Sequence, residues 1–253
     1  MTYQSIEVQF QDTVCGIRIA RPQAGNAIDD RLIEEFHRAL ATCETTANVV
    51  IISGSPEVFC VGADFQAVAG SVGGKGGVDP GPLYDVWLRM ATGPYVTISH
   101  VRGKANAGGI GFVAASDIVI ADEDAQFSLS ELLFGLFPAC VMPFLVRRVG
   151  HQAAHYLTLT TQPINARRAF EIGLVDAVEP QSDALLKRHV QRLRRLSKTA
   201  IQRYKSYMGE LGGQLGGLKR PAVAANLEMF SDPVNLKGIV DYVERGIFPW
   251  EKN

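Results

Sequence analysis

The chain has 253 residues, of which 47% are hydrophobic and 20% are charged, and its formal net charge is −1 at pH 7. This length fits one large domain, or one domain with an appendage, and the composition supplies enough apolar residues for a sizeable core. The near-zero net charge excludes a general attraction to nucleic acid or anionic lipid, so neither is expected as a partner.

Cysteine spacing and the first residues of the chain indicate the compartment. Cys15, Cys43, Cys60 and Cys140 lie far apart without a C-x-x-C pair, which predicts buried free thiols rather than disulfides or a zinc site. The opening "MTYQSIEVQFQD" lacks the pattern of a signal peptide, and no apolar run approaches the roughly 18–20 residues of a membrane span. We therefore expect a reduced cytoplasmic protein that does not enter a membrane.

The first half of the chain alternates between strand and helix patterns. Two segments joined by three residues predict a β-hairpin, and a helix capped by Asp29 follows it. Expected strands lie over 5–10, 14–20, 48–53, 95–101, 117–121 and 125–129, and expected helices over 29–44 and 82–91. Residues 69–82 hold six glycines and two prolines and are expected to form a mobile loop. The alternation predicts an α/β fold.

The second half is predicted to be mostly helical. The expected helices cover 140–150, 151–160, 165–173, 182–208, 221–231 and 233–246, with a glycine-rich break over 209–217. No internal repeat is present, and the glycine breaks are too short for interdomain linkers. We therefore expect an α/β core over 1–180 and a helical C-terminal region over 181–253 of the same domain.

The stretch "HVRGKANAGGIGFVAASDIVIADED", residues 100–124, allows two interpretations. Residues 109–114 match G-x-G-x-x-A, and Glu131 lies twenty residues beyond Gly111, as in a dinucleotide-binding fingerprint. In that fingerprint the acid stands at the end of the second strand, whereas here that strand ends at Asp122 or Glu123. The order of elements therefore favours the other interpretation, a glycine turn whose free N–H groups hold a developing negative charge.

A second glycine turn supports an oxyanion hole. Gly62-Ala63-Asp64 follows an apolar strand and enters a predicted helix. Two such loop-to-helix junctions can direct unpaired N–H groups at one oxygen atom. Small residues are needed there, because a branched side chain would hold a substrate carbonyl away from the backbone.

Four segments in this order resemble the crotonase (enoyl-CoA hydratase/isomerase) superfamily. They are "RPQAGNAI", "FCVGADF", "VRGKANAGGIGFVAASDIVIADEDAQFSLSELLFGLFP" and "ARRAFEIGLVDAV". The resemblance implies a spiral of ββα units with a helical C-terminal trimerisation region. It also implies that the backbone N–H groups of Ala63 and Gly108 hold the enolate oxygen of an acyl thioester, carried on CoA or phosphopantetheine, without a metal or redox cofactor.

The chain departs from the two-glutamate pattern of the hydratases in this superfamily. The first glutamate position is Gly111 here, and only the second, Glu131, is kept. A single carboxylate could remove the α proton and then protonate a departing β-hydroxyl group. The alternative is that Glu131 only interacts with the dipole at a helix N-terminus.

Five longer segments are more specific: "RPQAGNAI", "PEVFCVGADFQ", "PLYDVW", "ATGPYVTISHVRGKANAGGIGF" and "FSLSELLFGLFPACVMPFLVRRVG". They resemble one subgroup of the superfamily, the β-branching dehydratases of bacterial polyketide synthase clusters. The resemblance implies dehydration of a 3-hydroxy-3-methylglutaryl group on an acyl carrier protein, by a homotrimer or a dimer of trimers. Two other functions stay open: a CoA-linked hydratase of short branched acids, and a non-catalytic scaffold for carrier proteins.

The remaining candidate residues carry weaker signals. The residues expected to bind the substrate are Asp64, Phe65, Tyr84, Asn106 and Gly109. Lys104, Arg89 and Tyr84 could meet a distal carboxylate, or could be surface or packing residues, and Asn106 could simply stabilise its turn.

Residues 187–205 form a basic stretch with no acidic residue. Its Lys and Arg residues are Lys187, Arg188, Arg192, Arg194, Arg195, Lys198, Arg203 and Lys205. They are interpreted as a solvated helical face, with Leu186, Val190, Leu193 and Leu196 turned inward, as a dock for an acidic carrier or CoA phosphates, or as an RNA-binding surface.

Overall fold

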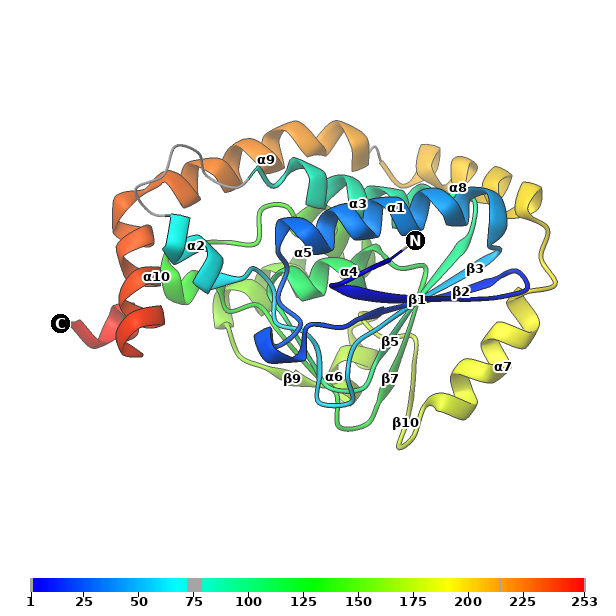
Figure 1. Ribbon diagram of the computed structural model, residues 1–253, viewed down its shortest axis with the longest axis horizontal. Coiled ribbons are helices and arrows are strands. Elements are labelled where there is room, and N and C mark those ends of the chain that lie inside the picture. The colour runs from blue at the N-terminus through cyan, green and yellow to red at the C-terminus, as the bar shows by residue number, and fades with distance from the viewer. Residues whose placement is uncertain (1, 72–78, 214, 253) are drawn as a thin grey trace.

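Two sheets form the centre of the molecule in the computed structural model, which describes residues 2–71, 79–213 and 215–252 (Figure 1). In the described residues, one sheet has the strand order β1-β2-β3-β5-β7-β10 and the other β4-β6-β8-β9. The strands are β1 (Ile6–Gln11), β2 (Val14–Ile19), β3 (Val49–Ser53), β4 (Val58–Cys60), β5 (Val96–Val101), β6 (Lys104–Asn106), β7 (Ile118–Asp122), β8 (Gln126–Ser128), β9 (Ile164–Asn165) and β10 (Ala177–Glu179).

Helices cover and connect these sheets. They are α1 (Asp30–Thr46), α2 (Phe65–Ser71), α3 (Gly81–Thr92), α4 (Gly108–Ala115), α5 (Met142–Thr160), α6 (Ala166–Glu171), α7 (Asp183–Leu193), α8 (Lys198–Leu211), α9 (Leu215–Ser231) and α10 (Pro233–Arg245), with short 3-10 turns η1 (Pro22–Ala24), η2 (Glu131–Phe134) and η3 (Pro249–Lys252). Figure 1 shows α1, α3, α8 and α9 above the larger sheet and α6 below it.

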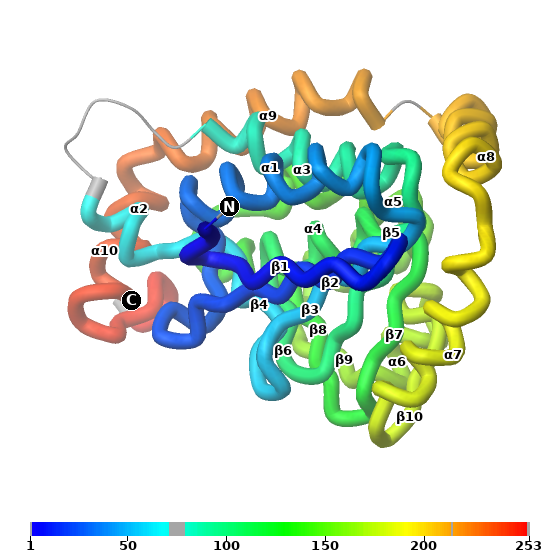
Figure 2. The backbone as a smooth tube through the Cα atoms, turned by 45° about the vertical axis from the view of Figure 1, so that its right-hand side comes forward, coloured from blue at the N-terminus to red at the C-terminus, as the bar shows by residue number. Residues whose placement is uncertain are grey.

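The chain alternates between the two sheets. The pairs β3/β4, β5/β6 and β7/β8 each give one strand to the larger sheet and the next to the smaller, and a helix or helical turn follows each pair (Figure 2). All these strands lie parallel to their neighbours from the other pairs. This arrangement confirms the predicted spiral of ββα units. It places the loops that follow β4, β6 and β8 at one edge, where they form the site described below.

Local signals in the sequence account for the first elements. β1 and β2 pair antiparallel, which confirms the predicted hairpin. The Asp29 carboxylate accepts a hydrogen bond of 2.8 Å from the Leu32 N–H, and it therefore caps α1 as predicted. Strand β3 is apolar up to its last residue, Ser53, because it lies inside a parallel sheet where both faces are covered, and Val49, Val50 and Ile52 are fully buried.

Several predicted boundaries were wrong. The single helix expected over 182–208 is two helices, because Ser197 accepts from the Ala200 N–H and starts α8 anew. Leu196, expected to face inward, lies in this break and is 42% exposed. Of the loop expected over 69–82, residues 72–78 lie outside the described part of the chain, and its flanks are helical, ending α2 and starting α3. Most of the expected break over 209–217 also belongs to α8 and α9.

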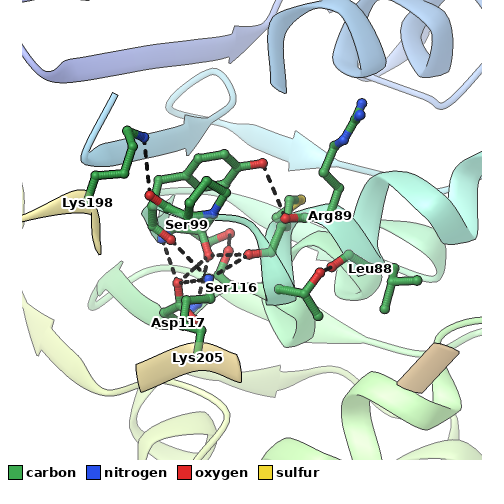
Figure 3. Close-up of polar contacts among 12 residues, drawn as sticks. Leu88, Arg89, Ser99, Ser116, Asp117, Lys198 and Lys205 are labelled. Carbon is green, nitrogen blue, oxygen red and sulfur yellow. Dashed lines mark hydrogen bonds and ion pairs between the residues drawn. The ribbon is translucent and has the colours of Figure 1, made fainter. Parts of the chain in front are cut away.

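Two lysines of the basic stretch are bound inside the molecule rather than presented to a partner (Figure 3). Lys205 donates to the backbone oxygens of Met90 and Tyr95, both at 3.0 Å, and pairs with Asp117 at 2.7 Å. Lys198 donates to three backbone oxygens at the ends of α1 and α3, those of Cys43, Ala47 and Pro94. These bonds hold α8 against the core. Removing one member of a buried ion pair would leave the other charge without a partner, which is strongly destabilising.

Two other basic residues of the stretch form exposed ion pairs, Arg188 with Glu179 and Arg194 with Asp12. The eight basic residues therefore do not form one continuous face. All four cysteines are buried and free, as predicted. No helix in the described ranges has the length and apolarity to cross a membrane.

Candidate active site

A cavity of about 1550 Å³ lies beside the loops that follow β4, β6 and β8. Its walls come from segments far apart in the sequence. Helix α10, near the end of the chain, contributes to them because it packs against α2 and η2. Most of the lining side chains are apolar, among them Ile28, Ile33, Val61, Phe65, Val68, Leu83, Trp87, Leu133, Phe134, Leu136, Phe137, Val141, Tyr242, Val243 and Phe248. Such a cavity suits an acyl chain and weakens the solvation of any charge inside it.

Ala63 and Gly108, whose backbone N–H groups the superfamily resemblance predicts as the donors of an oxyanion hole, both line this cavity. A Cβ built on Gly108 would lie 3.9 Å from the Ala63 nitrogen, and a Cβ built on Gly62 would lie 3.0 Å from the Gly108 nitrogen. Within the described residues neither N–H donates to a backbone oxygen, because the bridge between Ile28 and Ala63 uses the N–H groups of Ile28 and Asp64 instead. Two free donors are therefore available to one ligand oxygen.

Both loops have unusual backbone angles where they approach each other. Gly62 has φ of 94°, and Ala107, just before α4, has φ of 50° and ψ of −123°. Ala107 is fixed there because its N–H donates to the Ser128 oxygen at 3.0 Å. A non-glycine residue held in this region costs of the order of 1–3 kcal/mol, and such strain is typical of functional sites.

Glu131 brings a carboxylate into the same cavity. It begins the short turn η2 after β8, and its Oε2 atom is buried without a hydrogen-bond partner in the described structure. Burial raises the pKa of this carboxyl group to about 7, against the effect of the backbone N–H groups of Ser130 and Glu131 itself. A carboxylate with such a pKa can accept a proton and return it near neutral pH.

Asn106 links the hole to the carboxylate-bearing loop. Its Nδ2 atom donates to the Ser130 hydroxyl at 3.0 Å, and its Oδ1 atom accepts from the Ser128 hydroxyl at 2.8 Å. Asn106 lines the cavity and ends β6, two residues before Gly108. The side chain therefore holds the loops after β6 and β8 together, which is the turn-stabilising role considered from the sequence, and its predicted contact with substrate stays a prediction.

Asp64 and Phe65 also line the cavity. The Asp64 carboxylate pairs with Arg21 at 3.1 Å and accepts from the N–H groups of Gln66 and Ala67, so it supports the start of α2. Phe65 packs edge-on against Phe134, with ring centres 5.1 Å apart. Both residues shape the cavity beside Ala63, and their roles toward a substrate stay predictions.

The other candidates do not reach the cavity. Tyr84, predicted to bind substrate, is fully buried and its hydroxyl donates to the Leu215 oxygen at 2.6 Å, so it joins α3 to α9. Gly109 faces away from the cavity, because a Cβ there would lie 2.3 Å from the Cys60 oxygen. Lys104 is exposed at the start of β6, and Arg89 pairs with Glu44 at 2.8 Å.

Sequence reasoning missed several lining residues. Arg31 is the only lysine or arginine among the described residues that line the cavity. Tyr242 and Phe248, from the C-terminal region, pack with Phe134 and close one wall. Trp87 of α3 also lines the cavity. Its ring leaves no room for a side chain at position 111, where a Cβ would lie 2.3 Å from the indole, so this position is a glycine. A bulky aromatic residue at helical spacing gives no sign by itself that it faces a cavity.

The comparisons with known proteins agree with this geometry. The family model of the enoyl-CoA hydratase/isomerase family matches residues 9–253, so the chain belongs to that family. The chain is 57% identical to the bacillaene synthase dehydratase PksH of Bacillus subtilis, over 99% of this chain and 98% of that protein. It is 31% identical to the 2,3-dehydroadipyl-CoA hydratase of Escherichia coli, over 77% of this chain and 78% of that protein.

Solved structures support the same fold. The crystal structure of PksH from Bacillus subtilis aligns with a TM-score of 0.95 and 55% identity, covering 98% of this chain and 100% of that one. The enoyl-CoA hydratase of Bacillus halodurans, only 19% identical, aligns with a TM-score of 0.85 over 93% of this chain. The fold is therefore retained at low sequence identity.

We predict that Gly62→Ala lowers kcat by about 100-fold, because displacing one donor of an oxyanion hole has an effect of this size. The added Cβ would lie 2.7 Å from the Ala107 Cβ and 3.0 Å from the Gly108 nitrogen, at a positive φ. Gly70→Ala is the matched control, since no atom of the described residues lies within 4 Å of its added Cβ. Steady-state kinetics of both variants tests this, and equal activity of the two would contradict the assigned hole.

The raised pKa of Glu131 predicts the pH dependence of activity. A base must be deprotonated in the free enzyme, so kcat/KM should be constant above about pH 8 and should fall tenfold per unit below its pKa of about 7. A profile that stays flat down to about pH 5 would show an ordinary carboxyl pKa and would contradict the assignment.

The same shift predicts how stability depends on pH. The unfolded chain loses the Glu131 proton near its ordinary pKa of 4.5, whereas the folded protein keeps it until about 7. Stability is therefore lost as pH rises through this window, and Glu131→Gln should be more stable than the parent above pH 7, by up to about 3 kcal/mol. Thermal melting at low and high pH measures this difference, which also shows that the variant is folded.

Proposed function

We propose that the protein is a dehydratase of polyketide biosynthesis that removes water from a 3-hydroxy-3-methylglutaryl thioester on an acyl carrier protein. The observation that carries the proposal is the buried Oε2 atom of Glu131, which has no hydrogen-bond partner in the described structure and shares one cavity with two free backbone donors. Family membership and the 57% identity to PksH, named a bacillaene synthase dehydratase, support the reaction class and the pathway.

The reaction begins at the thioester carbonyl. Its oxygen accepts hydrogen bonds from the N–H groups of Ala63 and Gly108, and Glu131 removes a proton from the α carbon. The electron pair of that C–H bond moves onto the carbonyl oxygen and forms an enolate, which the two fixed donors stabilise. One such donor contributes about 10²–10³ in rate, so the pair supplies much of the stabilisation that an enolate lacks in water.

The second step uses the same carboxyl group as an acid. As the enolate collapses, the C–O bond to the β-hydroxyl breaks, and Glu131 gives its proton to the departing oxygen. The products are the α,β-unsaturated 3-methylglutaconyl thioester and one water molecule, and Glu131 is a carboxylate again. A group whose pKa lies near neutral pH performs both transfers without an external acid or base.

The carrier-bound substrate requires a protein partner. An acyl carrier protein presents its phosphopantetheine at the cavity mouth, and the apolar walls hold the branched acyl chain. Lys198 and Lys205 bond to groups within the chain, so a dock for the carrier on the basic stretch would use its other Lys and Arg residues. Assembly into a homotrimer or a dimer of trimers remains part of the proposal.

Intact-protein mass spectrometry of a carrier protein loaded with the 3-hydroxy-3-methylglutaryl group tests the proposal directly. We expect the carrier-bound species to lose one water with the parent protein and with Glu123→Gln, a control on an exposed glutamate. With Glu131→Gln we expect the rate to fall by at least about 100-fold, since general acid–base groups contribute 10²–10⁴.

Two other outcomes would assign a different function to the protein. Dehydration or hydration of the CoA ester alone would identify a CoA-linked hydratase of short branched acids. Carrier binding without any mass change, unaffected by Glu131→Gln, would identify a non-catalytic scaffold.

A further inference from the structure

Trp87 lines the same cavity as Glu131 and has an unsatisfied polar atom. Its side chain is 1% exposed, and its indole Nε1–H has no hydrogen-bond partner in the described structure. In the described residues only one other buried side-chain polar atom shares this state, Oε2 of Glu131. Both side chains line the same cavity. Buried polar groups nearly always have partners, so two exceptions in one cavity point to a ligand that supplies them.

The position of the indole relative to the oxyanion hole is fixed by α4. A Cβ built on Gly111 would lie 2.4 Å from Cε2 of Trp87, the ring carbon bonded to Nε1. Gly111 follows Gly108 by three residues, so the two lie on one face of α4 about one turn, or roughly 5 Å, apart. The Trp87 ring therefore packs against α4 one helical turn after the Gly108 nitrogen. This distance corresponds to the substituents on the β carbon of a bound thioester.

Packing holds the indole in this place. Trp87 meets Phe112 of α4 and Phe144 of α5 edge-on, each with ring centres 6.0 Å apart. The absence of a side chain at Gly111 lets the ring lie directly against α4. The position of the ring is thus set by packing among three helices, without a hydrogen bond from Nε1 within the described structure.

The two unsatisfied atoms have complementary chemistry. An indole N–H only donates, and a carboxylate only accepts, whereas a hydroxyl group does both. We propose that Trp87 donates a hydrogen bond to the β-hydroxyl oxygen of the substrate while Glu131 faces its other side, a role that rests on the proposed dehydratase function. Trp87 thereby selects thioesters with a β-hydroxyl group and orients the leaving oxygen toward the proton on Glu131.

Trp87→Phe tests this role, because it keeps an aromatic ring and removes only the N–H donor and part of the ring. The measurements are kcat/KM for dehydration and the inhibition constant of the 3-methylglutaryl thioester, which lacks the hydroxyl group. We expect kcat/KM to fall about tenfold or more and the inhibition constant to change less than twofold, since one hydrogen bond is lost only with the hydroxylated ligand. Trp250→Phe, on an exposed side chain outside the cavity lining, should change neither value.

A parallel loss of dehydration and of inhibitor binding would assign Trp87 a packing role only, and an unchanged kcat/KM would also overturn the proposal. If Trp87→Phe does not fold, Trp250→Phe leaves Trp87 as the single tryptophan of the chain. Its fluorescence should then shift to longer wavelength when a 3-hydroxy-3-methylglutaryl thioester binds in a Glu131→Gln background, and should stay unchanged with the 3-methylglutaryl thioester. Equal responses to both ligands would contradict the contact.

This fluorescence result is independent of turnover. If the parent protein dehydrates no β-hydroxy thioester, the proposed function fails, while a response specific to the hydroxylated ligand would still support the Trp87 contact.

Discussion

The close approach of two backbone loops is the constraint on which the site depends. The loop after β4 and the loop after β6 come so near that a single Cβ on Gly62 would lie 2.7 Å from the Ala107 side chain. Gly62 and Ala107, the residues before Ala63 and Gly108, both have positive φ angles. The pairing of β4 with β6, and of β6 with β8, supplies the rigid support that keeps these angles in place.

The raised pKa of the Glu131 carboxyl group follows from the same architecture. β8 delivers Glu131 to an apolar cavity closed by Phe134 and by α10, and the loss of solvation there raises its pKa to about 7. Asn106 connects the loop that carries Gly108 to the loop that carries Glu131 through Ser130. The donors and the base are therefore held as one unit, which favours a reaction in which charge moves between them.

The sequence predicted most of what depends on local pattern. The hairpin, the Asp29 cap, the buried strands and the spiral follow from hydrophobic periodicity, cap residues and family motifs, and the structure has all of them. The glycine turns indicated an oxyanion hole, and the resemblance to the superfamily then assigned Ala63 and Gly108 as its donors. The predictions failed for residues whose role is set by contacts with residues distant in the sequence. Tyr84 lies in a segment expected to line the pocket but bonds to Leu215. Lys205 belongs to a basic stretch expected to be solvated or to bind a partner but pairs with Asp117.

The packing partners of the aromatic residues also could not be predicted from the sequence. Trp87 and Gly111 stand on different helices, and only the packed fold shows that the absent side chain of one makes room for the indole of the other. Likewise Tyr242 and Phe248 reach the cavity because the C-terminal helix α10 returns to α2, which no local pattern encodes. Such pairings depend on the final packing of helices rather than on their propensities.

The central claim is that Glu131 removes the α proton of a thioester and that the two backbone donors stabilise the enolate that forms. Deuterium uptake from D₂O at the α carbon of a carrier-bound 3-methylglutaryl group tests it most directly, because this ligand has no leaving group and can undergo only the first step. The account predicts uptake with the parent protein above pH 7 and none with Glu131→Gln. No uptake with the parent, or equal uptake with both proteins, would contradict it.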